Sequence, residues 1–314
     1  MLKIIQLVLG IYWVLAAGHG WAQTCAPAPQ AATSVQIQAA QQHARDHGFL
    51  WRMSKGGHSS FLYGTIHVAK FEWLFPGPQV MQALRGSDSM VLEMDMLDAG
   101  IQAEIARAMA ALPHTTIPPA LSRRLQRQAE AYCVPYATLA AMSPEMQVTA
   151  LTMLVGRKAG LEAEFAIDSV LADIGHRTRK QMVSLETPDL QLQVLHMDSA
   201  AETQAFVSDS LDELESGRSQ ALLERIARAW ESADYAEMAR FEEWCECLKT
   251  DSERAMMRRA LDERNPAMAE RIDALHMASK QAFVAVGSLH MFGPAGLPIL
   301  MEKRGYKVEQ LSLR

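Results

Sequence analysis

Two patterns of apolar residues alternate along the chain. Short unbroken apolar runs, rich in β-branched and aromatic residues, predict buried strands, and stretches with apolar residues every three or four positions predict helices. The runs typical of strands lie at residues 49–53, 60–63, 89–92, 181–185, 281–286 and 306–311. Strands separated by helical segments are the pattern of an α/β protein with a central sheet.

Both ends of this pattern predict a recognisable motif. Lys55-Gly56-Gly57-His58 separates the first two strands and predicts a β-hairpin. The last two strands flank a helix over 294–303 that stops at Gly305, which predicts a βαβ unit with parallel strands.

The middle of the chain is predicted to be helical. Helical periodicity covers 99–112, 119–133, 144–157 and 164–175, then several segments from about 200 to 261 and a last one from Asn265-Pro266 to about 279. The sequence has no low-complexity linker that would split it. We therefore expect one α/β domain over 48–314, with a mixed central sheet and a large helical insertion at about 99–180 and 188–280.

The first residues are typical of a secretory signal peptide. Lys3 precedes an apolar run over 4–17, and small residues lead up to Ala22, after which we expect cleavage. The run is shorter than the ~20 residues that a spanning helix needs. We predict a periplasmic or secreted protein without a membrane span after cleavage, in which 23–47 form a tail leading into a short helix.

Export makes the cysteines candidates for disulfide bonds. The chain has Cys25, Cys133, Cys245 and Cys247. We expect Cys245 and Cys247 to be too close to bridge each other comfortably, which favours a bond from Cys133 to one of them. A Cys-x-Cys metal or redox site is the alternative, and it ranks lower because no third soft ligand is nearby in sequence.

The charge of the protein excludes some partners. The formal net charge is -6 over 314 residues. Nucleic acids and anionic membranes select for basic patches, and the arginine pairs here sit among acids at helical spacing, as on a solvated helix face.

The pattern Gly-x-x-His occurs at the end of two predicted strands. Gly64 to His67 closes one near the start, and Gly287 to His290 closes one near the end. Open α/β sheets place their sites at the carboxyl ends of strands, so two histidines far apart in sequence can meet in one crevice. A single histidine after a strand is usually structural; the repetition favours function.

Carboxylates end two further strands. Glu93, with Asp95 beside it, follows one, and Glu186 follows the other. Two imidazoles and one or two carboxylates suit a divalent metal with an open position, and hydrolysis is the natural chemistry of that set. A metal-free site, with one histidine as general base, is the alternative. Either glutamate can instead be a helix cap.

Two further residues, Arg264 and Asp168, are candidates for the site. Arg264-Asn265 stands just before the last strand-bearing segment, where it can reach the crevice to bind a substrate carboxylate or to hold Glu93 or Glu186. A solvated helix cap is the alternative. Asp168 lies inside a predicted helix, which indicates a buried hydrogen-bonding residue rather than a ligand. The sequence has no His-Glu-x-x-His, Gly-x-Ser-x-Gly, Walker or Gly-x-Gly-x-x-Gly motif.

As a set, these motifs resemble the TraB/GumN family from about Leu50 to the C-terminus. The matching segments are 62–67, 91–95, 185–187 with Gln191-Leu192, 263–265 with Met268, and 286–290 with Gly293, Gly296 and Gly305-Tyr306. One departure is Ala166, where the family commonly has glycine before an apolar residue and aspartate.

The resemblance implies a chemistry. The family is related to the Tiki-type metalloproteases, which share the paired Gly-x-x-His motifs and an acidic residue and need a divalent metal such as manganese or cobalt. By that resemblance His67 and His290 are metal ligands, Glu93 is a metal ligand or the catalytic acid/base, and Glu186 and Arg264 support the site. Zinc fits the same ligands. Erythromycin esterase-like hydrolases and haem-binding ChaN-like proteins are more distant relatives that share the fold.

Two functions follow as hypotheses. The first is an exported metal-dependent hydrolase, a peptidase acting on a peptide or protein amide, which requires His67, Glu93 and His290 to converge. The second is a non-catalytic protein that binds haem or a peptide in the same crevice, which requires a deep apolar pocket lined by methionines.

Overall fold

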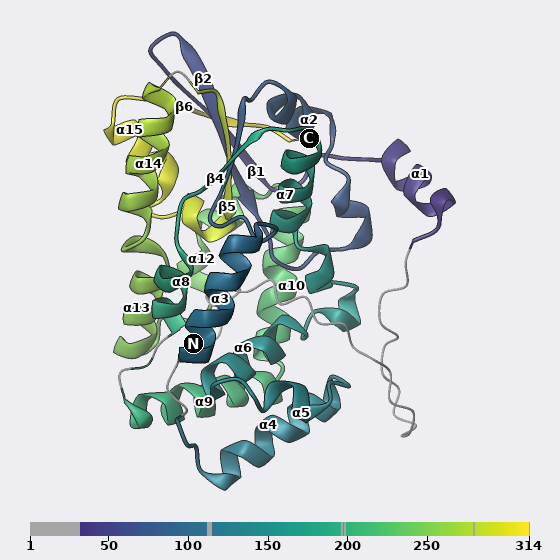
Figure 1. The fold of residues 1–314 in the computed structure, drawn as a ribbon, viewed down its shortest axis with the longest axis vertical. Helices are drawn as coiled ribbons and strands as arrows, with labels where there is room; N and C mark the ends of the chain where they lie inside the picture. Colours follow the sequence, from purple (N-terminus) through teal and green to yellow (C-terminus); the bar gives the residue numbers. More distant parts are fainter. Residues whose placement is uncertain (1–31, 112–114, 196, 198, 279, 314) are drawn as a thin grey trace.

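The computed structural model of the protein describes residues 32–111, 115–195, 197, 199–278 and 280–313. The predicted signal peptide over 1–22 and the start of the tail lie outside these residues. The short helix expected in the tail is present as α1 (Ser34–Gln42), which has no buried residue and stands apart from the rest of the chain (Figure 1).

The predicted mixed sheet is confirmed. It has six strands in the order β4-β3-β5-β2-β1-β6. They are β1 (Phe49–Lys55), β2 (His58–Thr65), β3 (Ser89–Leu92), β4 (Gln181–Ser184), β5 (Ala282–Gly287) and β6 (Lys307–Leu311). β2, β5, β3 and β4 are neighbours and pair in parallel, so their carboxyl ends meet at one edge.

The N-terminal hairpin and the last strand form the other side of the sheet. β1 and β2 form the predicted antiparallel hairpin, and β6 pairs antiparallel with β1. β6 therefore runs in the same direction as β5, as predicted, but two strands lie between them. The hairpin occupies the place beside β5, and the free edge of β1 receives the last strand.

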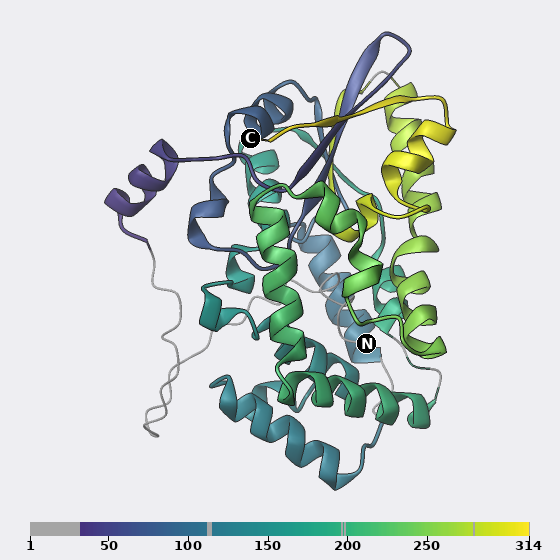
Figure 2. The ribbon, with the colours of Figure 1, turned by 180° about the vertical axis from the view of Figure 1, so that it is seen from behind.

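Helices make up most of the remaining chain. Those near the sheet are α2 (Pro78–Arg85), α3 (Ala99–Ala111), α7 (Ile167–Arg177), α8 (Pro188–Leu195), α14 (Asn265–Met277) and α15 (Leu297–Lys303). The others are α4 (Pro119–Ala131), α5 (Tyr136–Leu139), α6 (Pro144–Met153), α9 (Ala200–Glu215), α10 (Arg218–Glu231), α11 (Tyr235–Ala239), α12 (Phe241–Trp244) and α13 (Asp251–Met257). Figures 1 and 2 show α4, α5 and α9 at the end opposite the sheet, with α10 running between.

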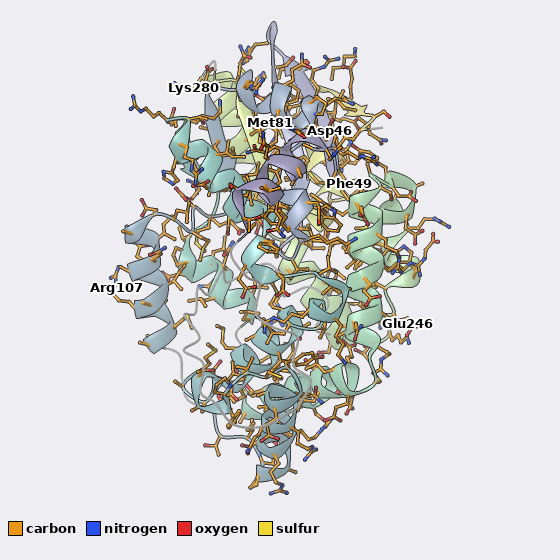
Figure 3. All side chains as sticks on the ribbon, turned by 90° about the vertical axis from the view of Figure 1, so that its right-hand side faces the viewer. Asp46, Phe49, Met81, Arg107, Glu246 and Lys280 are labelled. Atoms are coloured by element: carbon orange, nitrogen blue, oxygen red, sulfur yellow. A yellow bond between two sulfur atoms is a disulfide. The ribbon has the colours of Figure 1, made fainter. Side chains whose placement is uncertain are left out.

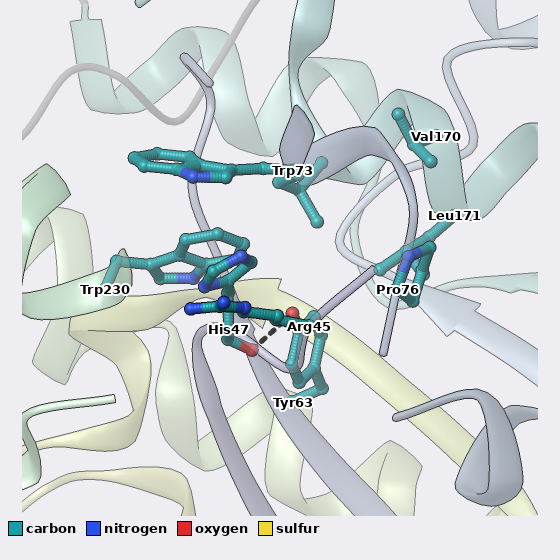
Figure 4. A pocket seen from close by; sticks show the side chains of 9 residues that line it. Arg45, His47, Tyr63, Trp73, Pro76, Val170, Leu171 and Trp230 are labelled. Carbon is teal, nitrogen blue, oxygen red and sulfur yellow. Dashed lines mark hydrogen bonds between the residues drawn. The ribbon is translucent and has the colours of Figure 1, made fainter. Parts of the chain in front are cut away.

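Trp230 of α10 joins the helical insertion to the sheet. Its indole is buried, and its Nε1 donates a hydrogen bond of 2.8 Å to the carbonyl of Gly64 in β2. Trp230, Tyr63, Trp73 and His47 line a pocket, and the aromatic rings of these side chains lie against one another (Figure 4). The Tyr63 hydroxyl donates to the His47 carbonyl at 2.8 Å, which fixes the start of β1 against β2.

Buried apolar residues of the sheet and of the helices form one continuous cluster. Phe49 of β1 lies within the body of the molecule, whereas the exposed Arg107 and Glu246 lie at its outer edges (Figure 3). The large helical content of the middle of the chain therefore packs on the same core as the sheet.

The expected disulfide pairing is wrong. Cys245 and Cys247 bond to each other, with their Cα atoms 5.1 Å apart, within the usual range for a disulfide. Glu246 between them has a φ of 53°, in the left-handed region, and this turn brings both Cβ atoms to one side. Residues two apart cannot bridge in ordinary extended backbone, and the prediction from spacing assumed such backbone.

Candidate functional site

Four predicted site residues follow the four parallel strands. His67 lies two residues beyond β2, Glu93 directly after β3, and Glu186 two residues beyond β4. His290 lies in η6 (Ser288–Met291), the 3₁₀ turn that continues β5. The Glu186 amide donates to the Glu93 carbonyl at 2.9 Å, so the exits of β3 and β4 stay side by side.

The two Gly-x-x-His copies pack directly on each other. Thr65 is the register partner of Gly287, and the Ser288 hydroxyl donates to the Thr65 carbonyl at 2.7 Å. A Cβ on Gly64 would lie 3.0 Å from Ser288 Oγ and 3.2 Å from its Cα. Neither glycine has a positive φ. Gly64 is therefore explained by the close approach of the second copy and not by an unusual backbone conformation.

Arg264 joins the two carboxylates. Its Nε donates to Glu186 Oε1 at 2.7 Å, its Nη2 donates to Glu93 Oε2 at 2.8 Å, and Nη2 also contacts Glu186 Oε2. The Arg264, Glu93 and Glu186 side chains are 3%, 7% and 1% exposed. Of the three possible roles of Arg264, these contacts support holding Glu93 and Glu186 in place.

The local backbone brings Arg264 to this place. It is the N-cap residue of α14 and lies two residues beyond the π-helix η5 (Arg258–Asp262). Its Nη1 donates to the Ala260 carbonyl at 2.8 Å. Such π-helical turns occur often at functional sites, because they redirect a side chain without ending the helix.

Glu93 has an unusual environment for a carboxyl group. Burial raises its pKa to about 7; Arg264 opposes this shift, and Glu186 adds to it. Its Oε1 accepts the Gly287 amide at 2.7 Å, and its Oε2 accepts from Gln191 at 3.4 Å in addition to Arg264. Glu93 therefore reaches β5 from β3 and lies beside the second Gly-x-x-His copy.

His290 is completely buried between Glu93 and Asn265. Its Nδ1 lies 2.5 Å from Asn265 Oδ1, and its Nε2 lies 3.8 Å from Glu93 Oε1. Burial lowers its pKa well below the ordinary value, and Arg264 lowers it further. Within the described residues, its Nε2 has no hydrogen-bond partner.

His67 is held in a similar way by Asp168. Its Nδ1 lies 2.5 Å from Asp168 Oδ2, and Thr65 Oγ1 donates to Asp168 Oδ1. Burial lowers the pKa of His67, but the Asp168 carboxylate outweighs burial, so the pKa is raised. Its Nε2 also lacks a hydrogen-bond partner among the described residues. Its side chain is 17% exposed, which makes it the more accessible of the two histidines.

Asp168 is better placed than the sequence indicated. The helix α7 starts at Ile167, so Asp168 belongs to its first turn and not to its interior. The Ile167 amide donates to the Ile66 carbonyl at 3.0 Å, which holds this turn against the exit of β2. Asp168 is a hydrogen-bonding residue, as expected, but it is only partly buried: it accepts from the Thr65 hydroxyl and forms an ion-pair contact with the site histidine His67.

Three contributors were missed by sequence reasoning: Thr65, Gln191 and Asn265. Gln191 Nε2 donates to Glu186 Oε2 at 3.1 Å as well as to Glu93. Asn265 was placed near the crevice together with Arg264, but its contact with His290 was not predicted. In the described part of the chain, no three His, Cys, Asp or Glu side chains already lie in a metal-binding arrangement.

The fold and site define an α/β protein with a buried histidine and carboxylate cluster at the carboxyl edge of a mixed sheet. The chain belongs to the TraB/PrgY/gumN family, whose profile matches residues 49–310. No curated protein and no solved structure matches it. None of the helices among the described residues is long and apolar enough to cross a membrane.

Proposed function

We propose that this protein is a metal-dependent hydrolase that cleaves a peptide or protein amide. The observation that carries the proposal is the pair of buried Nε2 atoms, on His67 and His290, which have no hydrogen-bond partner among the described residues. Buried polar atoms normally have partners, so unpartnered nitrogens on two site imidazoles favour a ligand bound at this site.

The residues fit a divalent metal by their chemistry. Two ligands of one tetrahedral zinc ion lie about 3.3 Å apart. His290 Nε2 and Glu93 Oε1 are 3.8 Å apart, so a small side-chain movement brings them within this range. His67, Glu93 and His290 would hold the ion, and manganese, cobalt and zinc all accept imidazole and carboxylate ligands.

A bound metal would supply a water of lowered pKa and would polarise the carbonyl that is attacked. The chain's own residues have separate tasks. Glu93, with a pKa near 7, can take up a proton from the attacking water and release it to the leaving amine. Arg264 stabilises the charged form of Glu93, and Glu186 keeps the guanidinium in place. Burial of the cluster excludes competing water.

The alternative of a haem-binding protein has less support. It required a deep, apolar, methionine-lined pocket beside the histidines. Among the described residues, the hydrogen-bond and ion-pair partners of the His290 side chain are Asn265 and Glu93. The ion-pair partner of the His67 side chain is Asp168. Polar and charged partners of this kind suit a small cation better than a porphyrin.

The decisive measurement is divalent-metal content together with metal-dependent peptide cleavage of the chain from Gln23. It is made on wild type, His67→Ala and His290→Ala, with His43→Ala, an exposed residue after α1, as the matched control. We expect about one metal per chain in wild type and His43→Ala, and loss of metal and cleavage in both site variants. A chain that binds no metal but forms a haem complex abolished by either site variant would contradict the proposal.

We also propose that the chain is exported. Its N-terminal apolar run and the Cys245–Cys247 disulfide support this, because disulfides persist in oxidising compartments. N-terminal sequencing of chain from the periplasm or medium should begin at Gln23, and recovery of uncut chain from the cytoplasm alone would refute export.

A further inference from the structure

Each imidazole of the site has a different acceptor beside its Nδ1. His67 has the carboxylate of Asp168, and His290 has the amide oxygen of Asn265. Resting on the proposed hydrolase site, we propose that Asp168 and Asn265 are positioning residues. They fix both histidines in the tautomer that carries its proton on Nδ1, so that each Nε2 keeps its lone pair for a metal ion.

The orientation of Asn265 decides the tautomer of His290. Asn265 Nδ2 lies 2.8 Å from the carbonyl of Ala295 and 3.4 Å from that of His290. Carbonyl oxygens only accept hydrogen bonds, so the donating NH₂ group must face them and Oδ1 must face the ring. Since Oδ1 also only accepts, Nδ1 of His290 must be the donor. A neutral imidazole has one proton on its two nitrogens, so Nε2 is unprotonated.

The same reasoning applies to His67 through a carboxylate. Asp168 Oδ1 accepts from the Thr65 hydroxyl, and Asp168 Oδ2 lies 2.5 Å from His67 Nδ1 without the alignment of a hydrogen bond. A carboxylate oxygen this close favours the proton on Nδ1, because an ionised carboxylate only accepts. The Thr65 contact and the Ile167 to Ile66 backbone hydrogen bond keep the carboxylate from turning away. A carboxylate increases the electron density of the imidazole ring more than an amide does. His67 Nε2 is therefore the stronger metal ligand of the two nitrogens.

The two positioning residues come from different parts of the fold. Asp168 belongs to the first turn of α7, and Asn265 to the first turn of α14. Neither reaches the centre of the cluster itself. Each acts through one histidine, which makes their effects separable by mutation.

The test is a long-range ¹H–¹⁵N correlation spectrum of the metal-free, ¹⁵N-histidine-labelled chain at about pH 8.5, where imidazoles are neutral. The spectrum distinguishes the two tautomers. Signals are assigned with His67→Gln and His290→Gln. The variants are Asp168→Ala and Asn265→Leu, and the control is His176→Ala, which removes the partner of Asp95 from the other end of α7. Manganese affinity is measured on the same samples.

We expect the Nδ1–H form for both histidines in wild type and in the control. Asp168→Ala should move His67 alone toward the Nε2–H form, and Asn265→Leu should move His290 alone. Each change should weaken manganese binding by about 10- to 100-fold. Asn265→Asp retains an acceptor and should keep the tautomer of His290, which a purely structural role for Asn265 does not predict.

Wild-type spectra with the proton on Nε2 of either histidine would overturn the inference, whatever the variants do, so a variant that fails to fold does not remove the test. Equal spectra for wild type, Asp168→Ala and Asn265→Leu would overturn it too. Nδ1–H tautomers in a chain that binds no metal would support the positioning roles and refute the proposed metal site, so the two failures are distinguishable.

Discussion

At the scale of single residues, Arg264 holds the candidate site together. It is one cation against two buried carboxylates, and its side chain is 3% exposed. Breaking a buried ion pair leaves an uncompensated charge, which costs more than the pair contributes. The stability of the fold and the geometry of Glu93 therefore depend on the same side chain.

Arg264→Met should lower the free energy of unfolding of the metal-free chain by about 3–5 kcal/mol, measured by urea denaturation. The exposed Arg107→Ala should stay within about 0.5 kcal/mol of wild type. Adding Glu186→Gln to Arg264→Met should restore part of the lost free energy of unfolding, because one of the two buried carboxylates without a cationic partner is removed. A loss below about 1 kcal/mol for Arg264→Met would mean that the carboxylates are hydrated or protonated in the folded chain.

His276 is a second buried histidine, far from the site, and it gives a pH dependence. Its Nδ1 lies 2.9 Å from Ser60 Oγ, its Nε2 lies 2.9 Å from the Lys55 carbonyl, and its ring stacks on His58. Burial lowers the pKa of His276. Above about pH 6.5 the imidazole is neutral in both the folded and the unfolded chain. Below that pH the unfolded chain takes up the proton first, so the free energy of unfolding falls as the pH drops.

The His276→Gln variant should therefore show a flatter loss of stability than wild type between about pH 7 and about pH 5. The measurement is the urea midpoint across that range. His43→Gln, which changes an exposed histidine, should follow the wild-type curve. Parallel curves for wild type and His276→Gln would show that His276 titrates alike in both states.

At the scale of elements, the two Gly-x-x-His segments form one unit although they are more than two hundred residues apart in sequence. β2 and β5 pair in parallel, and Ser288 at the start of η6 packs against Gly64. The site depends on this contact, because it sets the separation of the two strand exits that carry His67 and His290.

Gly64→Ala should destabilise the chain by about 1–3 kcal/mol, because the added methyl group overpacks the contact with Ser288. It should also weaken metal binding, since the two exits must move apart. Gly86→Ala is the control: Gly86 has a φ of -75°, and a Cβ there would meet nothing closer than 3.4 Å. Equal stability of the two variants would show that the segments adjust freely to each other.

At the scale of the whole molecule, the helical insertion and the sheet share one core. Phe206 of α9 and Trp230 of α10 belong to the same cluster of buried apolar residues as Phe49 and Phe283 of the strands. The Trp230 hydrogen bond to Gly64 reaches the strand that carries His67. Loss of packing in the helices should therefore change the position of the strand that carries His67.

We predict a single cooperative unfolding transition for the chain from Gln23, as one domain requires. Far-ultraviolet circular dichroism reports the helices, and near-ultraviolet circular dichroism reports the buried tryptophans at the junction with the sheet. The two curves should coincide in urea. Trp230→Ala should shift both together, by about 3–5 kcal/mol. Separate transitions would show that the insertion folds as a unit of its own.

The sequence by itself determined the elements and the main site residues. Strand-like segments in the sequence identify all six strands. The central strands β3 and β5 are buried throughout and are apolar runs, because a strand buried on both faces needs apolar side chains there, whereas the edge strands β4 and β6 are only partly buried. The Gly-x-x-His and strand-end glutamate patterns identify His67, Glu93, Glu186 and His290, because the carboxyl ends of parallel strands meet wherever the strands pair. These features follow from local chemistry and from a general rule of sheet topology.

Only the tertiary structure decided the partners. The sequence predicted Asp168 inside a helix, whereas in the structure a 3₁₀ turn precedes α7, and Asp168 in the first turn of α7 lies against His67. The left-handed backbone of Glu246 allowed Cys245 to bond Cys247, and no spacing rule encodes that conformation. Arg264 had three possible roles in sequence, and the pairing of β3 with β4 made it the common partner of two carboxylates. Such contacts depend on which segments meet in space, which local patterns do not specify.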